Sequence, residues 1–113
     1  MYKLFGIPNC DTVKKARDYL TKKKIEHEFI DFKKTPPTTA DIERWKAFSG
    51  DFPVNRSGLT YKKNKEEFEA LTDAKKPAFI TANSSMIRRP VLERNGTVLH
   101  LGFDEEKYKS ILK

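Results

Sequence analysis

The chain has 113 residues and a formal net charge of +7, and it contains one cysteine and two histidines. This length suits one compact domain and is too short for two ordinary ones. A single cysteine excludes a disulfide framework and a cysteine-based metal site, and two histidines are too few for a histidine cluster, so we expect no bound metal. No apolar stretch approaches the ~20 residues that cross a membrane, and cysteine usage this low is typical of a reducing compartment. We therefore expect a soluble, cytoplasmic protein with no membrane partner.

The basic residues are distributed in short lysine runs at 22–24, 33–34, 62–63 and 75–76. Such runs are typical of solvated helix faces. The aromatic residues recur at spacings expected of a core and do not alternate with lysines as base-stacking platforms do; they include Phe29, Phe32, Trp45 and Phe68. Nucleic acid is accordingly not an expected partner.

The first third of the chain has the pattern of a β-α-β unit. Residues 2–7 form a short apolar run that suits a buried strand, which Gly6 and Pro8 end. The apolar residues of 11–24 recur three and four positions apart, which predicts one amphipathic helix. Residues 27–32 form a β-prone run that completes the unit, with parallel strands and a right-handed connection.

The middle of the chain is expected to be helical with short connections. Thr39 is suited to cap a helix that Gly50 ends. Asn64, followed three residues later by Glu67, resembles the cap of a short helix. Pro77 can occupy the first turn of another helix.

The last third of the chain predicts a hairpin and a closing helix. Residues 89–94 and 97–101 flank Asn95-Gly96, the dipeptide best suited to a two-residue type I′ turn. Asp104 is placed to cap the final helix. The whole order predicts an α/β fold with a mixed four-stranded sheet and helices packed against it.

Cys10 lies where the first predicted strand ends and the first predicted helix begins. The free N–H groups and the positive end of the dipole at a helix start both favour a thiolate over a thiol. We therefore expect the pKa of Cys10 to lie below that of free cysteine. Asp11 opposes this lowering slightly, and Thr12 supports it as a hydrogen-bond donor. The alternative is an inert, buried cysteine. Because the sequence has no second cysteine, another molecule must resolve any oxidised intermediate.

Four separated segments carry a resemblance to a known family. They read Gly-Ile-Pro-Asn-Cys-Asp-Thr-Val-Lys-Lys-Ala-Arg at 6–17, Asn-Arg-Ser-Gly at 55–58, Ile-Arg-Arg-Pro at 87–90 and Leu-Gly-Phe at 101–103. In this order they resemble the arsenate reductase-like (ArsC, Spx and YffB) family over nearly the whole chain, and they are most similar to its YffB-like branch. The resemblance implies a single thioredoxin-like domain over 1–113, with a helical insertion at about 38–85 between the two halves of the sheet.

The resemblance also implies the site residues. Cys10 is the implied catalytic nucleophile, and Arg56 and Arg89 are implied to surround it and to bind an anion, work that suits the charged, planar guanidinium group. A cis peptide bond is implied at Arg89–Pro90, where an X-Pro link makes it accessible, and Arg88 is expected at the surface. The residues implied to bind substrate are Asn9, Asp11, Thr12, Arg56, Arg89 and Pro90.

Two departures from the family patterns narrow the function. Leu101-Gly102-Phe103 stands where arsenate reductases of the family have a third arginine, so the oxyanion site is incomplete. Val13 stands where Spx-type regulators have a second cysteine, so an internal dithiol switch is impossible. Both departures point to the YffB-like members, for which glutathione-dependent thiol reduction is implied.

Three functions follow as expectations. The first is an enzyme, a monothiol, glutathione-dependent thiol–disulfide reductase with no bound cofactor, with glutathione as co-substrate and glutathione or glutaredoxin as its resolving partner. The second is a non-enzymatic regulator that docks on RNA polymerase, as Spx-type proteins do. The third is an arsenate reductase coupled to glutathione or glutaredoxin.

Overall fold

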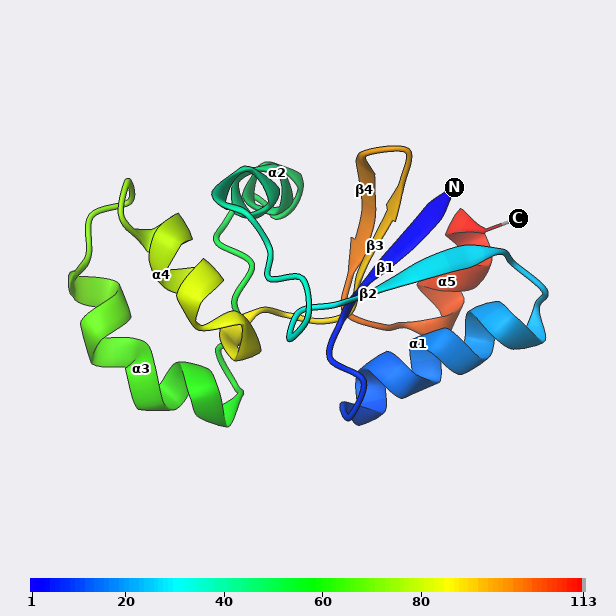
Figure 1. Cartoon of the computed structure of the whole chain (residues 1–113), viewed down its shortest axis with the longest axis horizontal. Helices are drawn as coiled ribbons and strands as arrows, with labels where there is room; N and C mark the ends of the chain where they lie inside the picture. The colour runs from blue at the N-terminus through cyan, green and yellow to red at the C-terminus, as the bar shows by residue number, and fades with distance from the viewer. Residues whose placement is uncertain (113) are drawn as a thin grey trace. The chain divides into compact units, whose positions relative to one another are not determined.

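The structure is a computed structural model that describes residues 1–112. Figure 1 shows its elements, which in chain order are β1 (Tyr2–Gly6), α1 (Asp11–Lys22), β2 (His27–Asp31), α2 (Thr39–Ser49), α3 (Leu59–Ala70), α4 (Lys76–Ala82), the short 3-10 helix η1 (Ser84–Met86), β3 (Val91–Arg94), β4 (Thr97–Leu101) and α5 (Glu105–Ile111). They form two compact units, one made of Met1–Thr35 with the chain from Arg89 onward, and one made of Pro36–Arg88. Within residues 1–112, no helix combines the length and the apolar character needed to cross a membrane.

The first unit contains a mixed four-stranded sheet in the order β2-β1-β3-β4. β1 is parallel to β2 and antiparallel to β3, and Leu4 is in register with Phe29 of β2 and with Leu92 of β3. β3 and β4 form a hairpin in which Asn95 and Gly96 have φ values of 51° and 83°, as a type I′ turn requires. The predicted β-α-β unit, hairpin and four-stranded sheet are confirmed.

Helices α1 and α5 pack on the same face of this sheet (Figure 1). Leu4 and Leu92 of the sheet contact Ala16 and Leu20 of α1 and Tyr108 of α5, and all five side chains are fully buried. Burial of each large apolar side chain contributes roughly 1.5–3 kcal/mol. This core holds α1, and with it the residue at its N-terminus, in place against the sheet.

Gly6 permits the close approach of β1 to α1. A Cβ atom at this position would lie 2.8 Å from Cγ2 of Val13, a side chain with no exposed surface. Any larger residue would push the start of α1 away from the strand that precedes it. The glycine therefore positions the loop that carries Cys10.

Helix α2 of the second unit begins with a capping box. Thr38 Oγ1 accepts from the backbone N–H of Asp41 at 3.1 Å, and Asp41 Oδ2 accepts from the backbone N–H of Thr38 at 2.9 Å. The predicted cap at Thr39 is therefore wrong by one residue, because the reciprocal bonds need an acid three positions after the cap. Gly50 ends the helix as predicted, with φ at 81°.

Helix α3 begins earlier than the sequence predicts. It starts at Leu59, after Gly58, and Asn64 lies inside it, where its side-chain amide donates to the carbonyl of Thr60 at 2.8 Å. The predicted start at Asn64 is therefore wrong. Pro77 lies in the first turn of α4, as predicted.

Aromatic rings form much of the core of the second unit. Phe68 packs edge-on against Phe52 and Tyr61, with ring centroids 6.1 and 6.0 Å apart, and Trp45 is fully buried. The core roles predicted for Trp45 and Phe68 are confirmed. Phe29, in the first unit, is only half-buried and has a different environment, described below.

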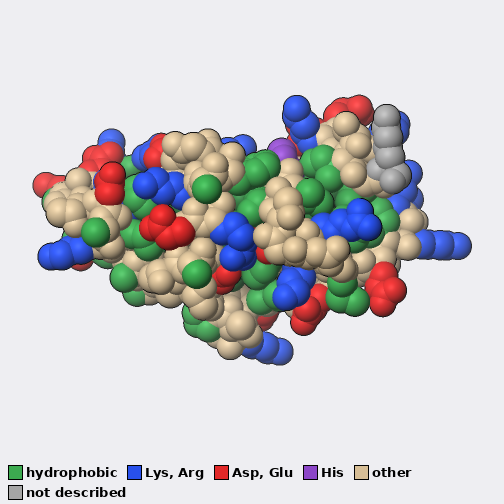
Figure 2. Space-filling view, turned by 90° about the horizontal axis from the view of Figure 1, so that it is seen from above, with side chains coloured by type: hydrophobic (Ala, Val, Ile, Leu, Met, Phe, Trp, Pro, Cys, Tyr) green, Lys and Arg blue, Asp and Glu red, His purple; other side chains and the backbone are tan. Residues whose placement is uncertain are grey.

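Charged side chains are mixed on the surface. Figure 2 shows Lys and Arg interspersed with acidic and apolar side chains across the face in view. This mixing agrees with the solvated lysines that the sequence predicts. Asp104 caps α5 as predicted, and its Oδ1 accepts from the backbone N–H of Lys107 at 3.2 Å.

Candidate functional site

Cys10 occupies the N-cap position of α1, as predicted. Its backbone is extended, with φ at −104° and ψ at 127°, and its carbonyl accepts the first helical bond from Lys14 N–H at 2.9 Å. Its own N–H donates to the carbonyl of Ile7 at 3.3 Å, which closes the turn after β1. The side chain is neither fully buried nor fully exposed. The thiol is therefore held rigidly at the helix start while part of it stays accessible.

The environment of Cys10 favours its thiolate. Partial burial raises the pKa of the thiol, but the backbone N–H of Val13, the guanidinium of Arg89 and the backbone N–H of Thr12 together outweigh it. The pKa of Cys10 is lowered from its ordinary value as a result.

Arg89, which lies two residues before β3, reaches the same thiol. The peptide bond between Arg89 and Pro90 is cis, as the family resemblance implies. Pro90 is buried, and its carbonyl accepts from the backbone N–H of Gly102 at 2.8 Å, which fixes this segment beside β4. The guanidinium of Arg89 hydrogen-bonds the Cys10 side chain and attracts its negative charge. These two predicted site residues are therefore brought together within the first unit.

Arg56 lies in the second unit, where it has two partners. Its Nη2 donates to Asp51 Oδ2 at 2.7 Å, and its Nη1 donates to the hydroxyl of Tyr61 at 3.0 Å. The hydrogen bond between Arg56 and Asp51 raises the pKa of the guanidinium and lowers that of the carboxyl group. The anion-binding role of Arg56 stays a prediction.

The other predicted substrate-binding residues surround the turn before α1. Asn9 is exposed, and Asp11 and Thr12 are exposed residues of the first helical turn. Arg88 is exposed, as predicted, and its backbone N–H donates to the carbonyl of Pro53 at 2.9 Å. Asn9, Asp11 and Thr12 therefore leave polar groups at the start of α1 available to a ligand.

An apolar segment occupies the place of the family's third arginine. Leu101 is buried, and Phe103 packs edge-on against Tyr108 with ring centroids 4.8 Å apart. Gly102 between them has a φ of 85°. This segment supplies no cation to an oxyanion.

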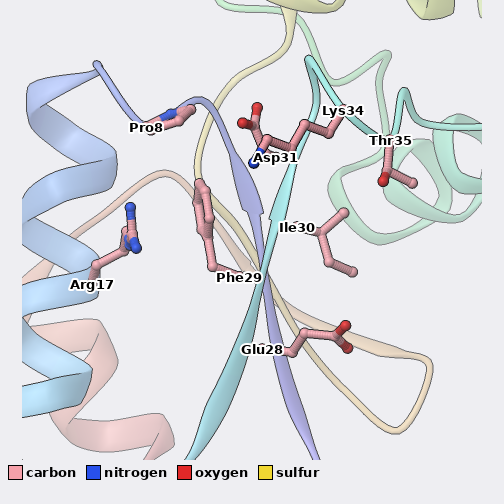
Figure 3. A pocket seen from close by; sticks show the side chains of 8 residues that line it. All are labelled: Pro8, Arg17, Glu28, Phe29, Ile30, Asp31, Lys34 and Thr35. Carbon is pink, nitrogen blue, oxygen red and sulfur yellow. The ribbon is translucent and has the colours of Figure 1, made fainter.

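A hollow beside β2 was not predicted from the sequence. It has a volume of about 440 Å³, and Figure 3 shows Pro8, Arg17, Phe29, Asp31 and Lys34 among the residues that line it. The guanidinium of Arg17 lies over the ring of Phe29, 4.1 Å from its centroid. The signal in the sequence was Arg17 itself, which follows Cys10 by two helical turns and so lies on the same helix face.

Comparisons with known proteins extend over both units. The family model described as ArsC matches residues 5–111. An uncharacterized protein from Haemophilus influenzae is 31% identical in an alignment of 116 positions that covers 97% of each chain. The solved structure of a YFFB protein is 37% identical with a TM-score of 0.87 and full coverage of both chains. An arsenate reductase (ArsC) related protein from Brucella melitensis is 33% identical with a TM-score of 0.72, over 99% of this chain and 94% of that one.

Proposed function

Because the chain belongs to the ArsC family and has its thioredoxin-like fold, we propose that it is a monothiol reductase with Cys10 as nucleophile and glutathione as co-substrate. The observation that carries the proposal is the lowered pKa of Cys10, the single cysteine of the sequence, at a helix N-terminus and beside Arg89. A thiolate is the nucleophilic form of cysteine. With no second cysteine in the chain, the reducing thiol comes from another molecule.

The reaction is an exchange between thiols and disulfides. The Cys10 thiolate attacks the glutathione sulfur of a mixed disulfide between glutathione and a substrate thiol. The substrate–glutathione S–S bond breaks, a Cys10–glutathione disulfide forms, and the substrate sulfur leaves as a thiolate that takes a proton from water. A second glutathione thiolate then attacks the glutathione bound to Cys10, releasing the Cys10 thiolate and glutathione disulfide. The substrate sulfur is reduced, and the sulfur of the second glutathione is oxidised.

Arg89 serves two stages of this exchange. It stabilises the Cys10 thiolate before attack, and it stabilises the same thiolate as the leaving group when the second glutathione attacks, because thiols of lower pKa leave faster. Guanidinium groups also bind carboxylates in a planar, two-pronged arrangement. We therefore assign a glutathione carboxylate to Arg89, with Asn9, Asp11, Thr12 and Pro90 beside the bound sulfur. A glutaredoxin can replace the second glutathione.

The proposal is tested by weighing the intact protein after incubation with glutathione disulfide. The expected product carries one glutathione on Cys10, and excess reduced glutathione removes it. Cys10→Ser should acquire no adduct. Absence of the adduct from the unmodified protein, or an adduct that excess glutathione leaves in place, would contradict the proposed function.

A further inference from the structure

The outer edge of β2 presents backbone hydrogen-bonding groups to its surroundings. β2 is the terminal strand of the four-stranded sheet. The backbone N–H of Phe32 donates to the carbonyl of Gly6 on β1 at 2.9 Å. Because successive residues of a strand in a parallel pair direct their backbone groups to opposite edges, Phe29 and Asp31 direct theirs outward. The carbonyl of Asp31 is occupied by the backbone amides of the turn that follows, at 3.0 and 2.8 Å. The N–H and C=O of Phe29 and the N–H of Asp31 therefore face outward.

Two hollows follow one another along this edge. The first is the hollow of about 440 Å³ that contains Arg17 and Phe29 (Figure 3). The second has a volume of about 340 Å³ and is lined in part by Thr21, Lys24 and His27, at the beginning of β2. We call the two hollows together the β2 groove. Its floor is the edge strand, and one of its walls is α1 with the turn after it.

Two basic residues, Arg17 and Lys24, line the helix wall of the β2 groove, and Lys14 lies one turn before Arg17 on the same helix face. The two hollows are also lined by the acidic residues Glu26, Glu28 and Asp31. Glu28 points away from α1 (Figure 3), and Asp31 Oδ1 accepts from the backbone N–H of Lys33 at 2.9 Å. The guanidinium of Arg17 lies over the ring of Phe29 and, within residues 1–112, forms no ion pair with a carboxylate. Its charge is thus available to an acidic group that enters the groove. An extended chain with acidic side chains on the helix side complements both the outward backbone groups and this wall.

The same helix face leads to the nucleophile. Cys10 precedes Arg17 by seven residues, which is two turns and a rise of about 10 Å. An extended peptide advances about 3.3 Å per residue, so about three residues span this distance. A peptide whose acidic side chain meets Arg17 can therefore bring a residue three positions away to the level of Cys10.

We propose that the β2 groove binds an extended, acidic segment of a partner protein by adding it to the sheet as a further strand. The main chain of the segment hydrogen-bonds Phe29 and Asp31, and an acidic side chain pairs with Arg17. The further statement that this segment belongs to a protein substrate, whose sulfur meets Cys10, rests on the proposed function. Binding of the segment does not depend on that function, and it is measured in Cys10→Ser.

The test uses amide resonance shifts of isotope-labelled Cys10→Ser, titrated with a capped octapeptide of alternating valine and glutamate. The expected result is a saturable shift of the Phe29 and Asp31 amides. Arg17→Gln should weaken binding about fivefold, as expected for loss of one partly exposed ion pair. Lys15→Gln removes the same charge from the opposite flank of α1, where Lys15 lines a different hollow with Tyr19, and it should leave binding unchanged.

Two further peptides separate strand addition from simple charge attraction. The same octapeptide with alternate nitrogens methylated cannot pair as a strand and should not bind, and one with lysine in place of glutamate should bind more weakly. Failure of the Phe29 and Asp31 amides to shift, or equal binding of the methylated peptide, overturns the inference. A glutathione adduct on Cys10 together with failed peptide binding would leave the proposed function intact. Peptide binding without the adduct would leave the groove as a binding surface and remove the proposed function.

Discussion

Replacement of Arg89 by glutamine should raise the pKa of Cys10 by somewhat less than one unit. The guanidinium contributes both a hydrogen bond and a favourable charge to the thiolate. A charge-assisted hydrogen bond contributes roughly 1.5–3 kcal/mol when it is well buried. Cys10 is partly exposed, so solvent screening reduces this contribution to about 1 kcal/mol. One pKa unit corresponds to about 1.4 kcal/mol, so the expected shift is about 0.7 unit.

The shift is measured from the rate of iodoacetamide alkylation as a function of pH. The midpoint of the profile reports the Cys10 pKa directly, because the sequence contains no other cysteine. Arg88→Gln is the matched control, since it removes the same charge from the adjacent, exposed residue and should leave the midpoint in place. Arg89→Lys keeps the charge but not the planar fork, and should give an intermediate midpoint. A midpoint in Arg89→Gln equal to that of the unmodified protein, or equal shifts in Arg88→Gln and Arg89→Gln, would refute the reasoning.

Three further predictions concern stability. Folding lowers the Cys10 pKa, so the unfolded chain binds more protons than the folded chain between the folded pKa and the ordinary value of about 8.5. In this pH window, urea unfolding should therefore show that the stability of the unmodified protein relative to Cys10→Ser rises with pH. A stability difference that stays flat or falls would contradict the predicted sign. Gly6→Ala should lower the free energy of unfolding by roughly 1–3 kcal/mol, because its Cβ meets fully buried Val13 at 2.8 Å, and an unchanged urea midpoint would disprove this contact. The hydroxyl of Tyr108 is buried without a hydrogen-bond partner among the described residues, so thermal unfolding of Tyr108→Phe should show stability unchanged or raised by up to about 1 kcal/mol; a clear loss would be the opposite result.

Local chemistry made part of the fold predictable. Asn95-Gly96 predicts its hairpin because few other dipeptides adopt two consecutive positive φ values easily. The error at Thr39 was avoidable, since Thr38 followed three residues later by Asp41 satisfies the capping-box spacing. The error at Asn64 was not avoidable in the same way, because an acid three residues after an asparagine also occurs inside helices.

In the candidate site, too, the features set by local sequence were predictable, and the contacts between distant residues were not. The position of Cys10 at a helix start follows from local sequence, because a helical pattern begins immediately after it. Its contact with Arg89 joins residues 79 positions apart in the sequence, and only the family resemblance indicated it. The pairing of Arg17 with Phe29 depends on how β2 packs beside α1, and neither spacing nor composition carries that information. Phe29 has the spacing of a core residue, yet its ring lies under a guanidinium at the edge of the sheet.

The amides of Thr12 and Val13 and the guanidinium of Arg89 favour the thiolate of Cys10 and lower the pKa of its thiol. Labelling the protein with carbon-labelled cysteine yields one side-chain resonance, since the sequence has one cysteine, and its chemical shift follows the ionisation of the thiol directly. Titration of this resonance should give a midpoint below the value of about 8.5 for free cysteine. A midpoint at or above that value would contradict the account.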